Sequence, residues 1–237
     1  MALNLACESI GSGPPLVVLH GLFGSGSNWR GVARALGDSH TVHCADLRNH
    51  GASPWADSMG YAAMALALRH PQRIGPLIVV DVAPISYADT LTPFAEAMRS
   101  VDVAAAASRA EVQRRLQQSV PDRDVVTFLM QNLVARNDHF DWRLNLPGIS
   151  GAMSELCAFP SDLLGLCYES PTTVIAGAQS NYVADRHGVS FAPMFGDVEI
   201  GVVENAGHWV HADQPAAFVT RVMQVLQRAY PYATPTH

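Results

Sequence analysis

The sequence predicts an α/β fold of three layers, in which helices cover both faces of a mostly parallel sheet. Short apolar runs alternate along the chain with helical patterns, which is the order expected of strand–helix repeats. Polar motifs follow several of these runs, and functional residues gather at the carboxyl ends of strands in such sheets. From residue 84 to residue 170 amphipathic helical patterns replace the strand signals, which predicts a helical insert.

Five apolar runs are predicted to be strands. The first, Leu16–Leu19, lies between Gly/Pro-rich stretches, as expected of a buried strand in a parallel sheet. The full set is Leu16–Leu19, Thr41–Asp46, Leu77–Val80, Thr172–Ala176 and Glu199–Val203.

The intervening segments are predicted to be helices. In the core they are Ser27–Leu36, Ala62–Leu68 and a helix over residues 214–229. The last one carries an apolar face, made of Phe218, Val219, Val222, Met223 and Leu226. Within the insert, Ser108 followed three residues later by Glu111 is a capping-box signature for the start of a helix.

The composition limits the classes of protein and partner that need to be considered. The 237 residues are 49% hydrophobic and 15% charged, which suits one sizeable core. A net charge of −6 without a Lys/Arg cluster argues against a nucleic-acid or anionic-membrane partner. No apolar run approaches the roughly 18 residues of a membrane span and no signal-peptide pattern is found, so a cytoplasmic protein is expected. The four scattered cysteines are expected to be reduced core residues.

Three strings of residues carry a resemblance to a known family. They are residues 16–25 (LVVLHGLFGS), 46–54 (DLRNHGASP) and 206–211 (AGHWVH), and together they resemble the α/β-hydrolase family. Residues 80–84, 142–147 and 177–183 are similar to its small single-chain esterases and thioesterases. The resemblance implies a hydrolase core over residues 1–83 and 171–230, a helical cap over 84–170 and a tail over 231–237.

The family's chemistry requires a serine nucleophile, a histidine base and an acid that orients the base. The resemblance implies His208 as the base, with nearby His211 fixing the loop. The acid lies in one of two places in the family, and Ser180-Asn181 occupies one of them without a carboxylate. This favours Asp81 as the acid, with Asp185 as the alternative.

The oxyanion of such a reaction is stabilised by backbone N–H groups. The glycines around His20-Gly21 allow the chain to turn close to a substrate oxygen. The resemblance implies the amides of Leu22 and Phe23 as donors, and His20 is expected to be structural.

The family's nucleophile stands in a G-x-S-x-G turn directly after a buried strand, and no such serine is found here. The nearest substitute is Ser58, in A-x-S-x-G, and the order Ser58, Asp81, His208 is the expected one. Turn-forming residues 51–55 precede it in place of a strand. Ser58 therefore stays open as either a nucleophile or a loop serine.

An internal deletion accounts for this pattern. Residues 59–65 resemble the start of the helix that follows the Asp46 strand, whereas residues 62–71 resemble the helix after the nucleophile. A deletion joined at the shared Ala62–Ala65 would remove one central strand–helix unit of roughly 30 residues. The Leu77 strand is then expected to move into the vacant place beside the Leu16 strand, which would carry Asp81 toward the nucleophile position.

Two classes of function follow. The first is a carboxylic ester or thioester hydrolase that acts on a small-molecule acyl substrate under the cap, without metal or organic cofactor. The alternative is a catalytically inactive remnant or binding scaffold. Lyase or peroxidase chemistry on the same fold is a weaker third option. The oligomeric state stays open, although an exposed sheet edge could promote association.

Overall fold

The apolar runs of the sequence form the strands of the core. The structure, a computed structural model, describes residues 4–55, 62–184 and 189–231. Its core strands are β1 (Cys7–Ile10), β2 (Pro15–Leu19), β3 (Thr41–Ala45), β4 (Leu77–Val80), β7 (Thr172–Gly177) and β8 (Val198–Val203). All five predicted strands are present, and β1 is an exposed strand that the sequence did not predict.

Helices separate these strands. The core holds η1 (Gly26–Trp29), α1 (Arg30–Leu36), α2 (Ala62–Arg69), η2 (Pro71–Arg73), α8 (Val210–Asp213) and α9 (Pro215–Ala229). The segment between β4 and β7 holds α3 (Thr92–Ser100), α4 (Arg109–Ser119), α5 (Arg123–Leu129), η3 (Met130–Asn132), α6 (Leu146–Gly151), α7 (Met153–Cys157) and η4 (Ser161–Leu163). As predicted, the Ser108 hydroxyl caps α4 by accepting from the Glu111 amide at 3.2 Å.

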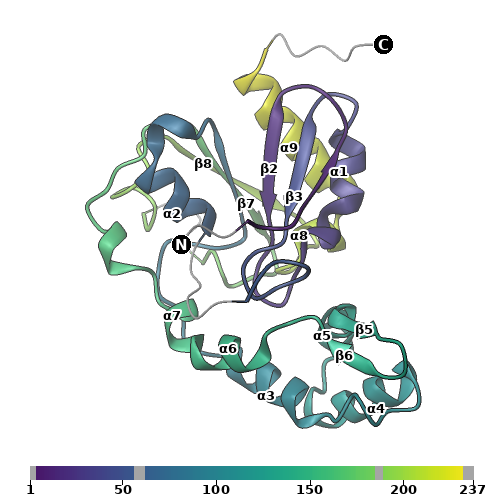
Figure 1. Ribbon diagram of the computed structural model, residues 1–237. Coiled ribbons are helices and arrows are strands. Elements are labelled where there is room, and N and C mark those ends of the chain that lie inside the picture. The colour runs from purple at the N-terminus through teal and green to yellow at the C-terminus, as the bar shows by residue number, and fades with distance from the viewer. Residues whose placement is uncertain (1–3, 56–61, 185–188, 232–237) are drawn as a thin grey trace.

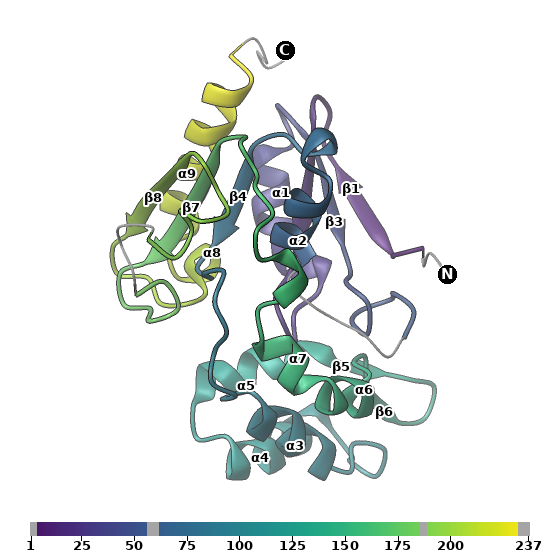
Figure 2. The ribbon, with the colours of Figure 1, turned by 90° about the vertical axis from the view of Figure 1, so that its left-hand side faces the viewer.

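Helices cover both faces of the strands, so the predicted three layers are confirmed. Successive side chains of a strand point to opposite faces. In β4, Leu77 and Val79 pack in one cluster with α2, whereas Ile78 and Val80 pack against a second cluster with α1 and α9. In Figure 2, α2 lies in front of the strands and α1 behind them. The predicted face of α9 packs in this second cluster.

The strands form two separate three-stranded sheets in the described residues. Their orders are β1-β3-β2 and β4-β7-β8. Within them β2 runs parallel to β3, and β4, β7 and β8 run parallel to one another, whereas β1 is antiparallel to β3. A mostly parallel arrangement is therefore confirmed, but it is interrupted between β2 and β4.

The expectation that the Leu77 strand moves beside the Leu16 strand is wrong. β4 pairs with β7 over Leu77–Val80, and β2 pairs with β3. Moving β4 would break this ladder and uncover the side chains that it buries under α2. The Leu16 strand is consequently not fully buried, because its side next to β4 has no neighbour among the described strands, and Val17 is 60% exposed.

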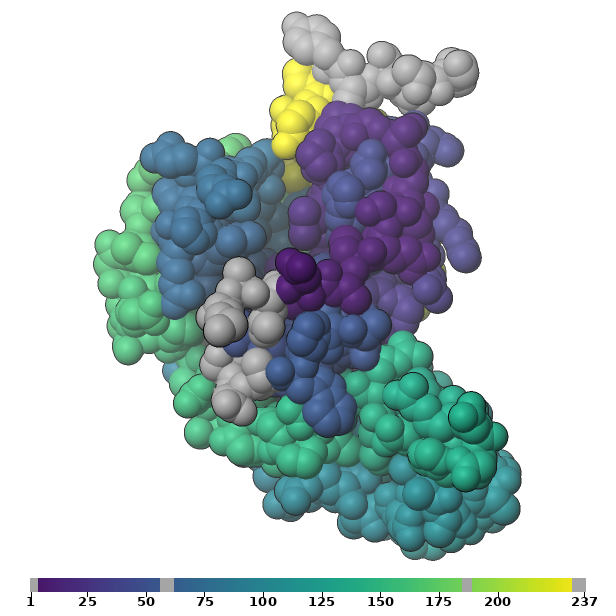
Figure 3. All heavy atoms as spheres, in the orientation of Figure 1, coloured from purple at the N-terminus to yellow at the C-terminus, as the bar shows by residue number. Residues whose placement is uncertain are grey.

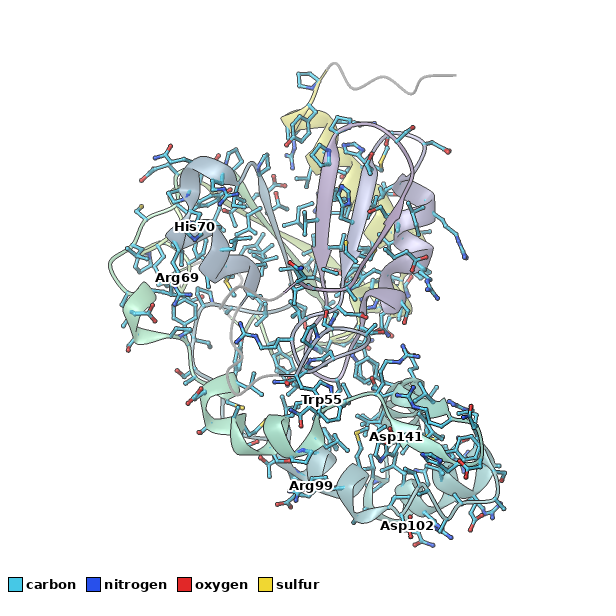
Figure 4. All side chains as sticks on the ribbon, in the orientation of Figure 1. Trp55, Arg69, His70, Arg99, Asp102 and Asp141 are labelled. Carbon is cyan, nitrogen blue, oxygen red and sulfur yellow. The ribbon has the colours of Figure 1, made fainter. Side chains whose placement is uncertain are left out.

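The segment after β4 folds into the predicted cap, a lobe at one end of the core (Figure 1). In Figure 4 the cap residues Arg99, Asp102 and Asp141 lie far from Arg69 and His70 at the end of α2. The expected absence of strands is wrong, because β5 (Leu133–Ala135) and β6 (Phe140–Trp142) form an antiparallel hairpin. These strands have three residues each, too few to show an alternating pattern in the sequence.

The last part of the predicted insert packs on the core. The side chains of Phe159, Leu163 and Tyr168 belong to the cluster that contains β4 and β7, whereas the cluster of the cap helices runs from Ala95 to Cys157. The chain thus returns to the sheet before β7 begins.

Candidate active site

Asp81 follows β4 directly and is completely buried. Its backbone has a positive φ of 46°, a conformation that is uncommon for residues other than glycine. The carboxylate accepts a hydrogen bond from the Gly177 amide at 3.0 Å, one from the Ser180 hydroxyl, and one from Nδ1 of His208 at 2.8 Å. Three donors, from the last residue of β7 and from the loops after β7 and β8, therefore stabilise one buried negative charge.

His208 lies in the loop after β8, opposite Asp81. Its side chain is 44% exposed and its ring stacks on the ring of Tyr182, with centroids 4.1 Å apart. Since Nδ1 donates to the carboxylate, Nε2 is the nitrogen with the free lone pair. Nε2 makes no hydrogen bond within the described residues. A histidine held in this way by a buried carboxylate has the geometry that general-base chemistry requires.

The turn after β7 contacts both members of this pair. The family resemblance of residues 177–183 marks this turn, but it does not show that the Ser180 hydroxyl bonds to Asp81. The hydroxyl of Ser180 donates to Asp81 and accepts from the Tyr182 amide at 3.2 Å. The Tyr87 hydroxyl accepts from the Ala83 amide and donates to the Tyr182 carbonyl, each at 2.7 Å. Burial raises the pKa of Tyr87 to about 12, so the hydroxyl keeps its proton for this bond.

The loop after β2 carries the two predicted oxyanion donors, and the structure distinguishes them. The Phe23 amide donates to Nε2 of His50 at 3.2 Å, so this amide is already engaged. The Leu22 amide makes no hydrogen bond within the described residues. Of the two predicted donors, the Leu22 amide is therefore the one without an acceptor among the described residues.

Two buried histidines, His20 and His50, bond to backbone amides in and next to this loop. Nε2 of His20 accepts from the Leu47 amide at 2.8 Å, and the rings of His20 and His50 lie 5.0 Å apart. Burial lowers the pKa of His20, and burial together with the neighbouring His20 lowers the pKa of His50 to about 4. Both are neutral near pH 7 and act as acceptors for backbone amides, so the structural role expected of His20 is supported.

The cap is attached to the same loop. The Phe23 side chain is 3% exposed and belongs to the hydrophobic cluster of the cap helices. Its carbonyl accepts from Nδ2 of Asn132 at 2.8 Å, and Asn28 in η1 donates to the Gln131 side chain at 2.5 Å. The cap is thus joined to the loop after β2 and to η1 by apolar packing and by hydrogen bonds.

Asn132→Leu is expected to lower the free energy of unfolding by about 1–3 kcal/mol, because the buried Phe23 carbonyl loses its side-chain donor. Urea unfolding followed by tryptophan fluorescence measures this loss. The control is Gln118→Leu at an exposed position of α4, with an expected change within about 0.5 kcal/mol. Equal stability of the two variants would contradict the contribution of this hydrogen bond.

His211 is not part of this arrangement. Its ring stacks on Trp29 with centroids 4.2 Å apart and lies edge-on to Phe218. Burial, and secondarily the neighbouring His208, lowers its pKa to about 4. These contacts agree with the predicted role of His211 in fixing the loop after β8.

Comparison with known proteins identifies the family. Residues 14–67 match a family described as the alpha/beta hydrolase fold. The sn-1-specific diacylglycerol lipase ABHD11 of Danio rerio is 31% identical over 254 residues, which cover 92% of this chain and 80% of the relative. The chain belongs to the α/β-hydrolase family. Its named relatives also include the esterase YbfF of Escherichia coli, 26% identical, with coverage of 95% of this chain and 99% of the relative.

This α/β-hydrolase is also similar in structure to an esterase of known structure. A structure titled as a marine microorganism esterase superposes with a TM-score of 0.89 and 28% identity, over 94% of this chain and 99% of that one. The resemblance to an esterase family and the predicted fold class are therefore confirmed.

The aligned regions are longer than this α/β-hydrolase itself. They span 254 residues for the Danio rerio relative and 259 for the Escherichia coli esterase, whereas the chain has 237. Each alignment must therefore contain positions at which the relative has a residue and this chain has none.

Two predicted site residues of this α/β-hydrolase, Ser58 and Asp185, lie outside the described residues. The described part of the chain contains no group of three or more His, Cys, Asp or Glu side chains that could hold a metal ion. Nor does it contain a helix long and apolar enough to span a membrane. None of the four cysteines forms a disulfide, but Cys7 and Cys167 are exposed, so the expected core position holds for Cys44 and Cys157 alone.

Proposed function

We propose that this protein is built to hydrolyse carboxylic esters or thioesters through an acyl-enzyme, with His208 as general base and Asp81 as the acid that orients it. One observation carries the proposal: a fully buried carboxylate accepts a 2.8 Å hydrogen bond from Nδ1 of a half-exposed histidine. This bond leaves Nε2 of His208 ready to take a proton from a nucleophile.

The reaction would proceed in two halves. Nε2 of His208 takes the proton of a serine hydroxyl while the serine oxygen attacks the acyl carbon of the substrate. The Leu22 amide donates a hydrogen bond to the resulting oxyanion. Collapse of this intermediate expels the alcohol or thiol, which receives the proton from His208. Water then attacks the acyl-serine in the same way and releases the carboxylic acid.

Ser58 is the candidate nucleophile in this chain. Intact-mass analysis after treatment with a serine-directed fluorophosphonate tests it directly, because only an activated serine is phosphonylated quickly. We expect one adduct on the parent protein and none on Ser58→Ala if Ser58 acts as the nucleophile.

Two controls interpret this result. Ser9→Ala changes an exposed serine in β1, which bonds to His43 at 2.8 Å away from the candidate site, and should keep any adduct. An adduct that persists in Ser58→Ala would place the nucleophile elsewhere. No adduct on either protein would show that this chain alone lacks acyl-enzyme chemistry.

The second candidate function is an inactive remnant that serves as a binding scaffold. The interruption between β2 and β4 favours it, because the strand before the nucleophile lies in the middle of the sheet in this family. A scaffold would keep its ligand after Ser58→Ala, whereas an enzyme would lose turnover.

The substrate is proposed to be a small acyl ester or thioester. Support comes from the apolar cluster of the cap, which reaches the oxyanion loop through Phe23, and from relatives that are named esterases and a diacylglycerol lipase. The absence of a disulfide among the four cysteines supports a reducing compartment, and we propose the cytoplasm.

A further inference from the structure

The turn after β7 contributes an aromatic ring to the candidate site. Residues 177–183 contain no carboxylate, but the ring of Tyr182 stacks on the imidazole of His208, with centroids 4.1 Å apart and planes inclined by 25°. Tyr182 is half-buried, whereas the His208 side chain is 44% exposed. Tyr182 therefore covers one face of a ring that is partly open to solvent.

A single hydrogen bond does not fix the orientation of the His208 ring. The bond from Nδ1 to the Asp81 carboxylate selects which ring nitrogen faces the acid. The ring can still turn about the direction of this bond, because the last torsion of a histidine side chain has broad minima. Stacking on an aromatic ring restricts the plane of the imidazole. The two contacts together determine where Nε2 of His208 points.

The position of Tyr182 is itself fixed relative to Asp81. The Tyr182 amide donates to the Ser180 hydroxyl at 3.2 Å, and this hydroxyl donates to the Asp81 carboxylate. The Tyr182 carbonyl accepts from the Tyr87 hydroxyl at 2.7 Å, and the two tyrosine rings lie 5.2 Å apart. The next residue, Val183, is completely buried. The carboxylate that binds Nδ1 of His208 thus also anchors the turn that carries the stacked ring.

A stacked tyrosine also suits the charge that His208 carries during proton transfer. When Nε2 takes a proton, the imidazole becomes a cation, and the face of an aromatic ring within about 6 Å attracts a cation. Burial, and secondarily the neighbouring Asp81 and Cys157, raises the pKa of Tyr182. The phenol therefore keeps its proton and presents a neutral ring to His208.

We propose that Tyr182 is a positioning residue for His208: its ring fixes the plane of the imidazole, so that Nε2 faces the reacting group, and it stabilises the imidazolium. This inference rests on the proposed function, in which His208 is the general base. The aromatic face carries the effect, so the Tyr182 hydroxyl is dispensable and the ring is not.

Nuclear magnetic resonance of His208 tests the proposal in the full chain. The carbon-bound ring protons of His208 lie over the Tyr182 ring and are shifted upfield by its ring current, and the bonded Nδ1 proton gives a separate resonance far downfield. We expect Tyr182→Leu to remove the upfield shift and to broaden the Nδ1 proton beyond detection. Tyr182→Phe should keep both signals. If the parent forms a fluorophosphonate adduct, its rate should fall by roughly five- to thirtyfold in Tyr182→Leu and by no more than about twofold in Tyr182→Phe.

Two further variants separate positioning from general stability. Val183→Ala removes buried methyl groups from the same turn but keeps the ring, so it should lower the urea midpoint and leave both His208 signals in place. Tyr230→Leu makes the same change as Tyr182→Leu at a 37% exposed position. Tyr230 follows α9, whose yellow end lies away from the teal cap in Figure 3, and its loss should not alter the His208 signals.

Each outcome decides the role of Tyr182. His208 signals that persist in Tyr182→Leu, or that disappear in Tyr182→Phe or Val183→Ala, would overturn it, as would an adduct that forms equally fast on Tyr182→Leu and the parent. The His208 signals do not require a reactive serine. Their selective loss in Tyr182→Leu, without an adduct on the parent, would support the positioning role and count against the proposed acyl-enzyme function alone.

Discussion

Asp81→Ala is expected to lower the free energy of unfolding by about 3–5 kcal/mol, as is usual when one partner of a buried charged contact is removed. The carboxylate is completely buried, and three donors converge on it from the last residue of β7 and from the loops after β7 and β8. Without it the Gly177 amide and the Ser180 hydroxyl lose their acceptor. Alanine also tolerates the positive φ at this position less well than aspartate.

The measurement is urea unfolding of the variant beside Asp38→Ala, which removes an exposed carboxylate and should change stability by no more than about 0.5 kcal/mol. If a chain reacts with a fluorophosphonate, Asp81→Ala should also slow that reaction by roughly 10³–10⁴-fold, because His208 loses its orientation. Equal stability of the two variants would contradict the claim that the hydrogen bonds to the buried Asp81 carboxylate stabilise the fold.

The strong apolar runs explain why so much of the core was predictable. β4 begins and ends where the sequence predicts, because four β-branched or leucine residues stand between Pro76 and Asp81. Polar residues that directly follow such runs must come together at one edge of a parallel sheet. The contact between Asp81 and His208 follows from this rule, although their part in catalysis stays a prediction.

Features that depend on contacts distant in sequence were not predictable. The bond between the Phe23 amide and His50 joins two loops, and neither loop's pattern shows which amide it occupies. The support of His208 by Ser180 and Tyr182 depends likewise on how the ends of β7 and β8 meet. Strand β4 was expected beside β2 because length allowed it, but the ladder with β7 and burial under α2 decided its place.

Acid is expected to destabilise this protein well above the range in which carboxylates titrate. The pKa of His50 is lowered from 6.5 to about 4, chiefly by burial, and that of His211 likewise. Between pH 4 and pH 6.5 these two histidines are protonated in the unfolded chain but not in the folded chain. The free energy of unfolding therefore falls as the pH drops from 6.5 toward 4. Each of these histidines accounts for up to roughly 3 kcal/mol of this loss.

The pH window from 4.5 to 6.5 isolates the histidines, because the carboxyl groups with a lowered pKa, such as Asp89 and Glu111, lose their contribution only below it. His50→Gln is expected to reduce the slope of the unfolding free energy in this window by about 1 kcal/mol per pH unit, the contribution of one proton.

Urea unfolding at a series of pH values measures this slope. His70→Gln is the matched control, because His70 is exposed at the end of α2 and meets water in both states (Figure 4). Equal slopes for the parent and His50→Gln would mean that the protein can protonate His50 without releasing the Phe23 amide. Since that amide donates to Nε2 of His50, the loop after β2 would then have to be held by the cap alone.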